Sequence, residues 1–188
     1  MRWSGFRKQK EKHTYGERGI KLLSLDNSLF YLINKNCSNS FLDILAPLFA
    51  KISNFQFLFV VGFVLVFFNK VKLKKLGISL MVGLGISYGL VYLLKTWIAR
   101  PRPFLVLPDV NLLIKTGGPS FPSGHAVFIF LAVTLAAVYY PKCRYLYILA
   151  FLAVFFRIYA GVHYPSDVLA GAALGSIIGY GLGKIGVK

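Results

Sequence analysis

Apolar stretches separated by short polar or basic loops fill most of the 188-residue sequence after residue 54. A helix crosses a bilayer with roughly 20 apolar residues, and the shorter stretches here need flanking Tyr, Trp and Lys side chains or a thin local bilayer to complete them. The pattern therefore predicts an all-α, polytopic helical bundle in a membrane. Five spans are expected, at residues 55–68, 76–94, 121–140, 145–161 and 168–183.

The region from residue 22 to residue 52 has a weaker pattern. Leucines, isoleucines and phenylalanines recur there at helical spacing, but Asp26, Asn27, Asn36 and Asp43 interrupt both apolar runs. The region forms either interfacial amphipathic helices or one additional, poorly hydrophobic span. We interpret residues 1–21 as a basic tail and residues 22–188 as a single membrane-embedded domain.

The last predicted span has glycine at every fourth position, so one face of that helix carries no side chains and a second helix can approach closely. These glycines are Gly171, Gly175, Gly179 and Gly183. Packing inside one molecule is favoured over a dimer interface, and a monomer is expected. Gly85 and Gly89 suggest a similar close approach in the second span.

Composition agrees with a membrane protein, because 56% of the residues are hydrophobic, only six are acidic and the mean hydropathy is +0.64. The formal net charge of +16 does not indicate nucleic-acid binding, because the basic residues bracket apolar segments and form no stripe on a polar fold. Cys37 and Cys143 lack metal-site spacing and are expected to be free thiols. No signal peptide is expected, because no uninterrupted apolar core follows the basic tail.

The distribution of charge predicts an orientation in the membrane. If residues 22–52 cross once, fifteen of the 22 basic residues share one side, which is cytoplasmic under the positive-inside rule. These fifteen lie in the tail, in the loops at 70–75 and 142–144, and at the C terminus. Six spans are therefore favoured over five, with the candidate site on the opposite face.

Cationic residues mark the end of the second predicted span. Lys95 and Arg102 straddle the point where Pro101 and Pro103 stop a helix and turn the chain into a loop. Taken alone, Lys95 reads as a snorkelling interfacial lysine and Arg100 as a positive membrane anchor. The sequence that follows changes the interpretation of Lys95 and Arg102.

The third span opens with Ser-Phe-Pro-Ser-Gly-His at residues 120–125. Pro and Ser at a helix start, with Gly allowing close approach, leave backbone N–H groups that point outward toward an anion. Ser123 and the N–H of Gly124 are therefore candidate phosphate-binding groups, and His125 lies beside them.

Arg157 lies late in an apolar run, where ionisable residues face a polar cavity or a partner and not lipid. His163 precedes Pro165, which is expected to begin the last helix and to place Asp167 in its first turn. Asp167 is either a simple helix-start charge or a carboxylate that accepts the imidazole N–H and leaves the other ring nitrogen as a nucleophile. Two histidines, one carboxylate and three cations are what metal-free phosphoryl transfer requires.

In order and spacing, these residues resemble the three-part signature of the type 2 phosphatidic acid phosphatase (PAP2) superfamily. The first part is Lys, six residues, Arg-Pro, and the second is Pro-Ser-Gly-His, matched at 95–103 and 122–125. The third is Ser-Arg, five residues, His, three residues, Asp, and Arg157, His163 and Asp167 match it. Phe156 stands where the family commonly has Ser, which removes a possible hydroxyl contact to phosphate. Three spaced elements are much more specific than any one alone.

The resemblance implies a helical bundle with the site at one membrane face and with no metal and no cofactor. The resemblance implies that His163 attacks phosphorus to form a phosphohistidine and that Asp167 orients His163. It implies that His125 protonates the leaving group and then helps water to attack the phosphohistidine. The groups that would hold the phosphate oxygens are Lys95, Arg102, Arg157, Ser123 and Gly124.

The resemblance also implies a phosphorylated membrane lipid as substrate and a multi-pass location in a bacterial inner (plasma) membrane, with the site facing the periplasm or exterior. Bacterial members act on undecaprenyl diphosphate, phosphatidylglycerol phosphate or lipid A 1-phosphate, and the sequence does not choose among them.

The loop at 104–118 either borders the entrance or is a plain connector.

Two other protein classes share part of this pattern. A non-catalytic lipid-phosphate binding or transport protein explains the cations but gives no reason for two histidines and Asp167 at this spacing. A vanadate-dependent haloperoxidase shares the site pattern but is water-soluble, which five apolar segments disfavour.

Overall fold

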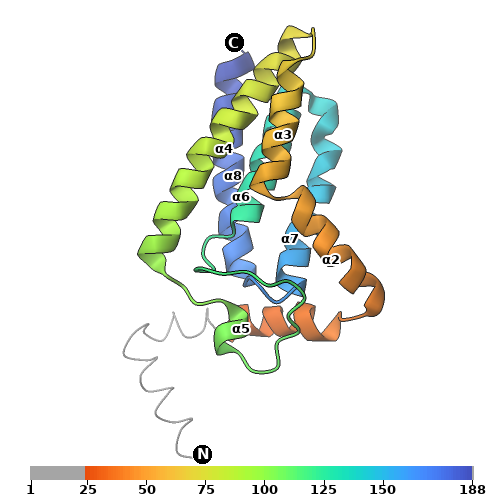
Figure 1. The fold of residues 1–188 in the computed structure, drawn as a ribbon, viewed down its shortest axis with the longest axis vertical. Helices are drawn as coiled ribbons and strands as arrows, with labels where there is room; N and C mark the ends of the chain where they lie inside the picture. Colours follow the sequence, from red (N-terminus) through yellow and green to blue (C-terminus); the bar gives the residue numbers. More distant parts are fainter. Residues whose placement is uncertain (1–23, 188) are drawn as a thin grey trace, which may run out of the picture.

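The computed structural model describes residues 24–187, and every regular element in this part of the chain is helical (Figure 1). The predicted all-α class is confirmed. Helical residues 24–31 continue into a π-helical turn, η1 (Leu32–Asn36). The later elements are α2 (Ser40–Ile52), α3 (Phe55–Val66), α4 (Val71–Ile98), α5 (Pro103–Val106), α6 (Gly124–Tyr139), η2 (Pro141–Tyr145), α7 (Leu146–Tyr159) and α8 (Pro165–Val187).

Helix α6 is the centre of the bundle. Residues 126–131 are all buried, and α4, α7 and α8 pack around the helix. A helix that is apolar on every side is stable in such a position because each face is covered by a neighbour. Helix α3 packs against α4 and also touches α6, and a single hydrophobic cluster joins most of the bundle.

The glycine face of α8 lies directly on the backbone of α6. A Cβ atom added to Gly171 would lie 2.7 Å from the carbonyl oxygen of Ser123, and one added to Gly175 would overlap the carbonyl oxygen of Val127. The predicted close packing inside one molecule is confirmed. This contact sets the separation of the first turns of the two helices, which carry the candidate site.

The corresponding expectation for the second span is wrong. Gly85 and Gly89 face open space in the described chain, with no heavy atom within 4 Å of an added Cβ. Helix α4 uses Gly77 against α3 and Gly83 against α6 and α8 for its close contacts. Glycine spacing alone did not reveal which face of α4 is covered.

Two helices of the described chain are candidate membrane spans by length and composition. They are Val71–Val106, which joins α4 to the α5 turn, and Pro165–Val187, which is α8. The α2 and α3 helices, bent by 51° at their junction, count as a third if the pair is one span, and α6 is apolar but shorter. The spans predicted at α4 and α8 therefore have structural support, and the others remain predictions.

Helical residues 24–36 lie across the end of the bundle at which α6 and α8 begin (Figure 1). Leu25, Leu29 and Leu32 are exposed on this helix, whereas Asp26 and Phe30 are buried. Leucines that face outward and a carboxylate that faces the protein fit an interfacial helix, which was one of the two expected alternatives.

The favoured sixth span is not formed by the described residues. Helix α2 leads directly into α3, and the two together make one passage from the site end of the bundle to the opposite end (Figure 1). The chain is therefore already at the site end at residue 24. The predicted tail, residues 1–21, lies outside the described residues.

Asn34 ties the N-terminal helix to the bundle. Its Nδ2 donates to the carbonyl oxygens of Tyr159 and Asn111, at 2.8 Å each, and its Oδ1 accepts from the N–H of Asn111 at 2.9 Å. Gly161 completes this junction with φ +78°, and an added Cβ there would lie 2.7 Å from the carbonyl oxygen of Asn111. The end of α7, the loop before α6 and the N-terminal helix therefore form one connected unit.

We predict that Gly175→Ala destabilises the protein, because its methyl group would overlap the backbone of α6. The expected loss is about 1–3 kcal/mol, the usual range for overpacking. Thermal unfolding in detergent, compared at one scan rate, measures it as a lower Tm. The matched control is Gly89→Ala in α4, where the added methyl group meets open space and alanine favours the helix by up to about 1 kcal/mol. Equal Tm values for the two variants would contradict the packing described here.

Candidate active site

The predicted site residues come together at one end of the bundle, where α4 and α7 end and α6 and α8 begin. The structure places Lys95 in the last turn of α4, Arg102 before α5, Ser123, Gly124 and His125 at the start of α6, Arg157 in the last turn of α7, His163 in the loop that follows, and Asp167 in the first turn of α8. Pro165 begins α8, as predicted.

Two cations hold the loop that precedes α6. Arg102 donates from Nε to the carbonyl oxygen of Gly118 at 2.9 Å and from Nη2 to that of Gly117 at 3.0 Å. Lys95 donates to the carbonyl oxygens of Pro119 and Ser120. Each cation crosses from its own helix to this loop, so the loop is fixed beside the first turn of α6.

Arg102 also fixes the protonation pattern of His163. Its Nη1 lies 3.2 Å from His163 Nε2 and donates to the carbonyl oxygen of Val162 at 2.8 Å. A guanidinium can only donate, so Nε2 must be the acceptor and Nδ1 must carry the proton in neutral imidazole. Nδ1 lies 3.4 Å from Asp167 Oδ2, to which it donates. The nitrogen with the free electron pair therefore points toward the cations.

Asp167 is fully buried and is held on both oxygens. Oδ2 accepts from the backbone N–H of Tyr164 at 2.9 Å in addition to the His163 contact. Oδ1 accepts from Arg100 Nη1 at 2.7 Å. Its backbone carbonyl accepts from the N–H of Ser123 at 3.0 Å, which connects the starts of α6 and α8. The second of the two expected roles, a carboxylate that orients His163, fits this geometry.

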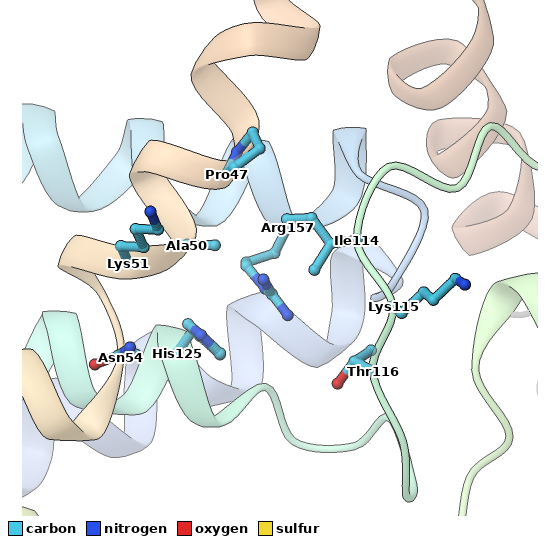
Figure 2. Close-up of a pocket in the computed structure, with 9 residues that line it drawn as sticks. All are labelled: Pro47, Ala50, Lys51, Asn54, Ile114, Lys115, Thr116, His125 and Arg157. Atoms are coloured by element: carbon cyan, nitrogen blue, oxygen red, sulfur yellow. The ribbon is translucent and has the colours of Figure 1, made fainter.

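Arg157 and His125 line a pocket of about 310 Å³ between α2 and the loop before α6 (Figure 2). Both side chains point into the space between these segments, His125 from α6 and Arg157 from α7. The loop contributes Ile114, Lys115 and Thr116, so part of the segment at 104–118 lines this pocket, as a loop at the entrance would. The other lining residues come from α2 and the turn after it: Pro47, Ala50, Lys51 and Asn54.

Two buried polar atoms of the site have no hydrogen-bond partner among the described residues. They are Nε of Arg157 and Oγ of Ser123, in residues that are 2% and 0% exposed. Leaving a buried polar group unsatisfied costs about 1–3 kcal/mol. Both groups can donate to the oxygens of an anion, so the arrangement is suited to binding one beside His125 and His163.

Burial and the surrounding cations lower the pKa of His163 well below its ordinary value. The side chain is 2% exposed, and removal from water is the larger cause; the positive charges of Arg157, Arg102 and Lys95 add to it. The imidazole is therefore neutral at neutral pH, which is the form that a nucleophile requires.

Sequence reasoning missed a part of the site. Arg100 is not a membrane anchor, because its side chain is 17% exposed and pairs with Asp167 and with Asp26 of the N-terminal helix. Ser166 joins the same contacts. The available signal was Asp26 itself, a carboxylate that interrupts an apolar helical run, but the sequence does not name its partner.

Phe156 belongs to a separate cluster. Its ring stacks on Phe49 of α2, with centroids 4.7 Å apart and planes at 17°, and it is 2% exposed. The residue that replaces the usual Ser therefore attaches α7 to α2 instead of contacting the phosphate-binding groups.

A helical membrane bundle with cations and a His–Asp pair at one end is typical of membrane proteins that process lipid phosphates. The chain belongs to the PAP2 superfamily, whose family model matches residues 76–186. The resemblance expected from the three sequence elements is confirmed.

Solved and curated relatives agree with this assignment. The crystal structure of Aquifex aeolicus LpxE matches with a TM-score of 0.71 and 37% identity, covering 87% of this chain and 94% of that one. The undecaprenyl-diphosphatase of Sulfolobus acidocaldarius is 36% identical over 112 residues, which are 58% of this chain and 54% of the relative. The bacitracin transport permease protein BcrC of Bacillus licheniformis is 45% identical over 76 residues, 39% and 37% of the two chains. The chain thus spans about half or less of the length of these curated relatives.

We predict that the imidazole of His163 titrates below pH 6.5, the ordinary value for histidine, because its charged form is buried among cations. NMR of protein with ¹⁵N-labelled histidine, in detergent, measures the midpoint, and His163→Gln assigns the signal. N-acetylhistidine added to the same sample is the internal control. A midpoint at or above that of the control would show that the cations do not act on His163 as described.

Proposed function

We propose that this protein is a membrane lipid phosphatase that removes a phosphate from the head group of an envelope lipid through a phosphohistidine intermediate. The observation that carries the proposal is the pairing of an oriented His163 with cations and with two buried polar groups that have no hydrogen-bond partner among the described residues. The family assignment supports the same reaction class.

In the first step the Nε2 electron pair of His163 forms a bond to phosphorus as the bond from phosphorus to the leaving oxygen breaks. Protonated His125 gives that oxygen a proton, so the lipid alcohol, or the lipid monophosphate from a diphosphate lipid, leaves in protonated form. Asp167 stabilises the charge that develops on the imidazole through Nδ1–H. The three equatorial oxygens are held by Lys95, Arg102, Arg157, Ser123 and the N–H of Gly124.

In the second step water attacks the phosphohistidine. His125 takes a proton from the water, the bond between Nε2 and phosphorus breaks, and its electron pair returns to the ring. Inorganic phosphate is released and both histidines regain their starting forms. We propose no metal for this reaction, because fixed cations lie where a metal-dependent phosphatase would carry carboxylate ligands.

A lipid substrate fits a site at the end of a membrane bundle, because the acyl or prenyl tail can stay in the bilayer while the phosphate enters the pocket. Many large apolar side chains of α3, α4, α7 and α8 are exposed, as lipid-facing residues are. We propose that α4, α6, α7, α8 and the α2–α3 pair form five spans, in which α2 extends the span that the sequence predicts at 55–68. Several relatives are named undecaprenyl-diphosphatases, which favours a prenyl diphosphate; other relatives are named for phosphatidylglycerol phosphate and lipid A, which are the alternative substrates within the same reaction.

We predict that the purified protein releases phosphate from at least one of three lipids, undecaprenyl diphosphate, phosphatidylglycerol phosphate and lipid A, with unchanged rate in EDTA. Quenched-flow trapping with ³²P-labelled substrate should show an acid-labile, alkali-stable phosphoenzyme. His163→Ala should abolish both turnover and label, and Asp167→Asn should lower kcat by about 100-fold or more. His125→Ala should be slow in turnover but can keep a trace of label with a diphosphate, whose leaving group needs less help.

Three outcomes of this experiment point elsewhere. Lipid binding without phosphate release would favour the binding or transport class. Loss of activity in EDTA, restored by one divalent ion, would contradict the metal-free step. Label that persists in His163→Ala, or that resides on Ser123, would remove His163 as the nucleophile.

We propose that the site faces the periplasm or exterior of a bacterial inner membrane. The end of the bundle opposite the site carries seven described basic residues in short loops and at the end of α8: Lys70, Lys72, Lys74, Lys75, Lys142, Arg144 and Lys184. At the site end Lys95, Arg100 and Arg102 are committed to contacts within the protein, whereas Lys51 and Lys115 are exposed. Uncommitted basic loops are retained in the cytoplasm.

We therefore predict that a cysteine at position 115 reacts with an impermeant thiol reagent in intact cells, and that one at position 72 reacts only after permeabilisation. Cys37 and Cys143 are first replaced by serine. Both positions are exposed lysines, so solvent access is matched and only the side of the membrane differs. The reverse labelling pattern would place the site in the cytoplasm.

A further inference from the structure

The starting observation is a buried charge network that joins the N-terminal helix to Asp167. Arg100 donates from Nη1 to Asp167 Oδ1 at 2.7 Å and from Nη2 to Asp26 Oδ2 at 2.6 Å. Arg100 is 17% exposed, and the Asp26 and Asp167 side chains are 9% and 0% exposed. One arginine therefore bridges two carboxylates from opposite ends of the chain, with the geometry of strong, charge-assisted hydrogen bonds.

Ser166 makes the bridge rigid. Its Oγ accepts from Arg100 Nη1 at 2.7 Å and donates to Asp26 Oδ2 at 2.5 Å, and its backbone N–H donates to Asp26 Oδ1 at 2.9 Å. Ser166 is the second residue of α8, so Asp26 satisfies one of the N–H groups that a helix start leaves without an intrahelical partner. Both oxygens of Asp26 are thus committed to Arg100 and to the start of α8.

The ring of Tyr164 closes the network from a third side. The guanidinium of Arg100 lies 3.9 Å from the centre of this ring, and Phe30 of the N-terminal helix packs on the same ring with centroids 5.9 Å apart. The backbone N–H of Tyr164 donates to Asp167 Oδ2. Arg100 therefore cannot move without disturbing the residue that shares Asp167 with His163.

We propose that Asp26 and Arg100 are positioning residues for the reaction, which set the orientation of Asp167 and through it that of His163. Arg100 takes Oδ1 of Asp167 and leaves Oδ2 for His163 Nδ1, so the carboxylate has one orientation only. Asp26 keeps Arg100 in place. The inference rests on the proposed phosphatase function, and it extends the working site to a helix that lies before the matched family region at 76–186.

The physical reason is the cost of a buried charge without a partner. With Asp26 neutralised, Arg100 loses one of two carboxylate partners and becomes free to rotate, and Asp167 loses its fixed contact on Oδ1. Arg102 still holds the His163 tautomer with an unprotonated Nε2, but the acceptor of the Nδ1–H is no longer fixed, so the ring holds its orientation toward phosphorus less firmly. The loss should fall on kcat, because the phosphate-binding groups are unchanged.

The experiment compares Asp26→Asn with Asp109→Asn. Asp109 pairs at 3.7 Å with Lys35, which belongs to the same N-terminal segment as Asp26. The side chain of Asp109 is 80% exposed and does not touch the Arg100 network. Asp26→Asn should lower kcat by about 10- to 100-fold with KM within about twofold, the range seen when the outer partner of an oriented histidine is removed. Asp109→Asn should keep both constants within about twofold of wild type.

A double variant tests whether Asp26 acts through Asp167. Adding Asp26→Asn to Asp167→Asn should cause no further loss of kcat, because the group that Asp26 positions is already disabled. A multiplicative loss in the double variant would overturn the proposal. So would an Asp26→Asn protein whose kcat stays within about twofold of wild type.

A second readout does not depend on turnover. The Nδ1–H of His163 should give the NMR signal of a proton hydrogen-bonded to Asp167 in wild type and in Asp109→Asn, and this signal should shift or broaden in Asp26→Asn. If no lipid is hydrolysed by wild type, the proposed function fails, and these spectra still decide the positioning role. If Asp26→Asn does not fold, Ser166→Ala replaces it, with an expected loss in kcat of about threefold to tenfold from the missing hydrogen bonds. A lower Tm with unchanged His163 signals and kcat would make the network merely structural and overturn the inference.

Discussion

The fully buried carboxylate of Asp167 is the constraint on which this architecture depends. A buried charge is tolerated only when it is paired and hydrogen-bonded, and here the partners come from the end of α4, from the α7–α8 loop and, through Asp26, from the N-terminal helix. These segments must all be in place before Asp167 can ionise. The same contacts that make the charge acceptable also fix which ring nitrogen of His163 is free.

The backbone contact between α6 and α8 is the second condition. Gly171 and Gly175 allow α8 to rest on the carbonyl groups of α6, and the N–H of Ser123 bonds to the carbonyl of Asp167. With larger residues the first turn of α6, which carries Ser123 and His125, would be displaced from His163. In the proposed reaction, phosphate binding and the orientation of His163 are thus linked through helix packing and not only through the site residues.

The sequence was sufficient for the helical class, for the grouping of Lys95, Arg102, Arg157, the two histidines and Asp167, and for the glycine face of α8, because each rests on local spacing. It was not sufficient for features that depend on tertiary pairing. From the sequence, Asp26 was interpreted as an interruption of an apolar helix and Arg100 as a membrane anchor. Two residues that form a buried ion pair and two separate surface charges look the same in the sequence around each of them. The sixth span failed for a related reason: apolar periodicity does not tell whether leucines face lipid along a span or along an interface.

The balance of charge explains why the network containing Arg100 and the phosphate-binding cations must be separate. Four cations, Lys95, Arg100, Arg102 and Arg157, lie near two carboxylates, Asp26 and Asp167, which leaves an excess of two positive charges. A phosphate monoester carries about two negative charges at neutral pH and matches this excess. Without Asp26, Arg100 would have Asp167 as its one carboxylate partner in this network. Its charge would then add to the repulsion among Lys95, Arg102 and Arg157. In the proposed reaction, the carboxylate of Asp26 therefore keeps Arg100 for orientation and leaves Lys95, Arg102 and Arg157 for the phosphate.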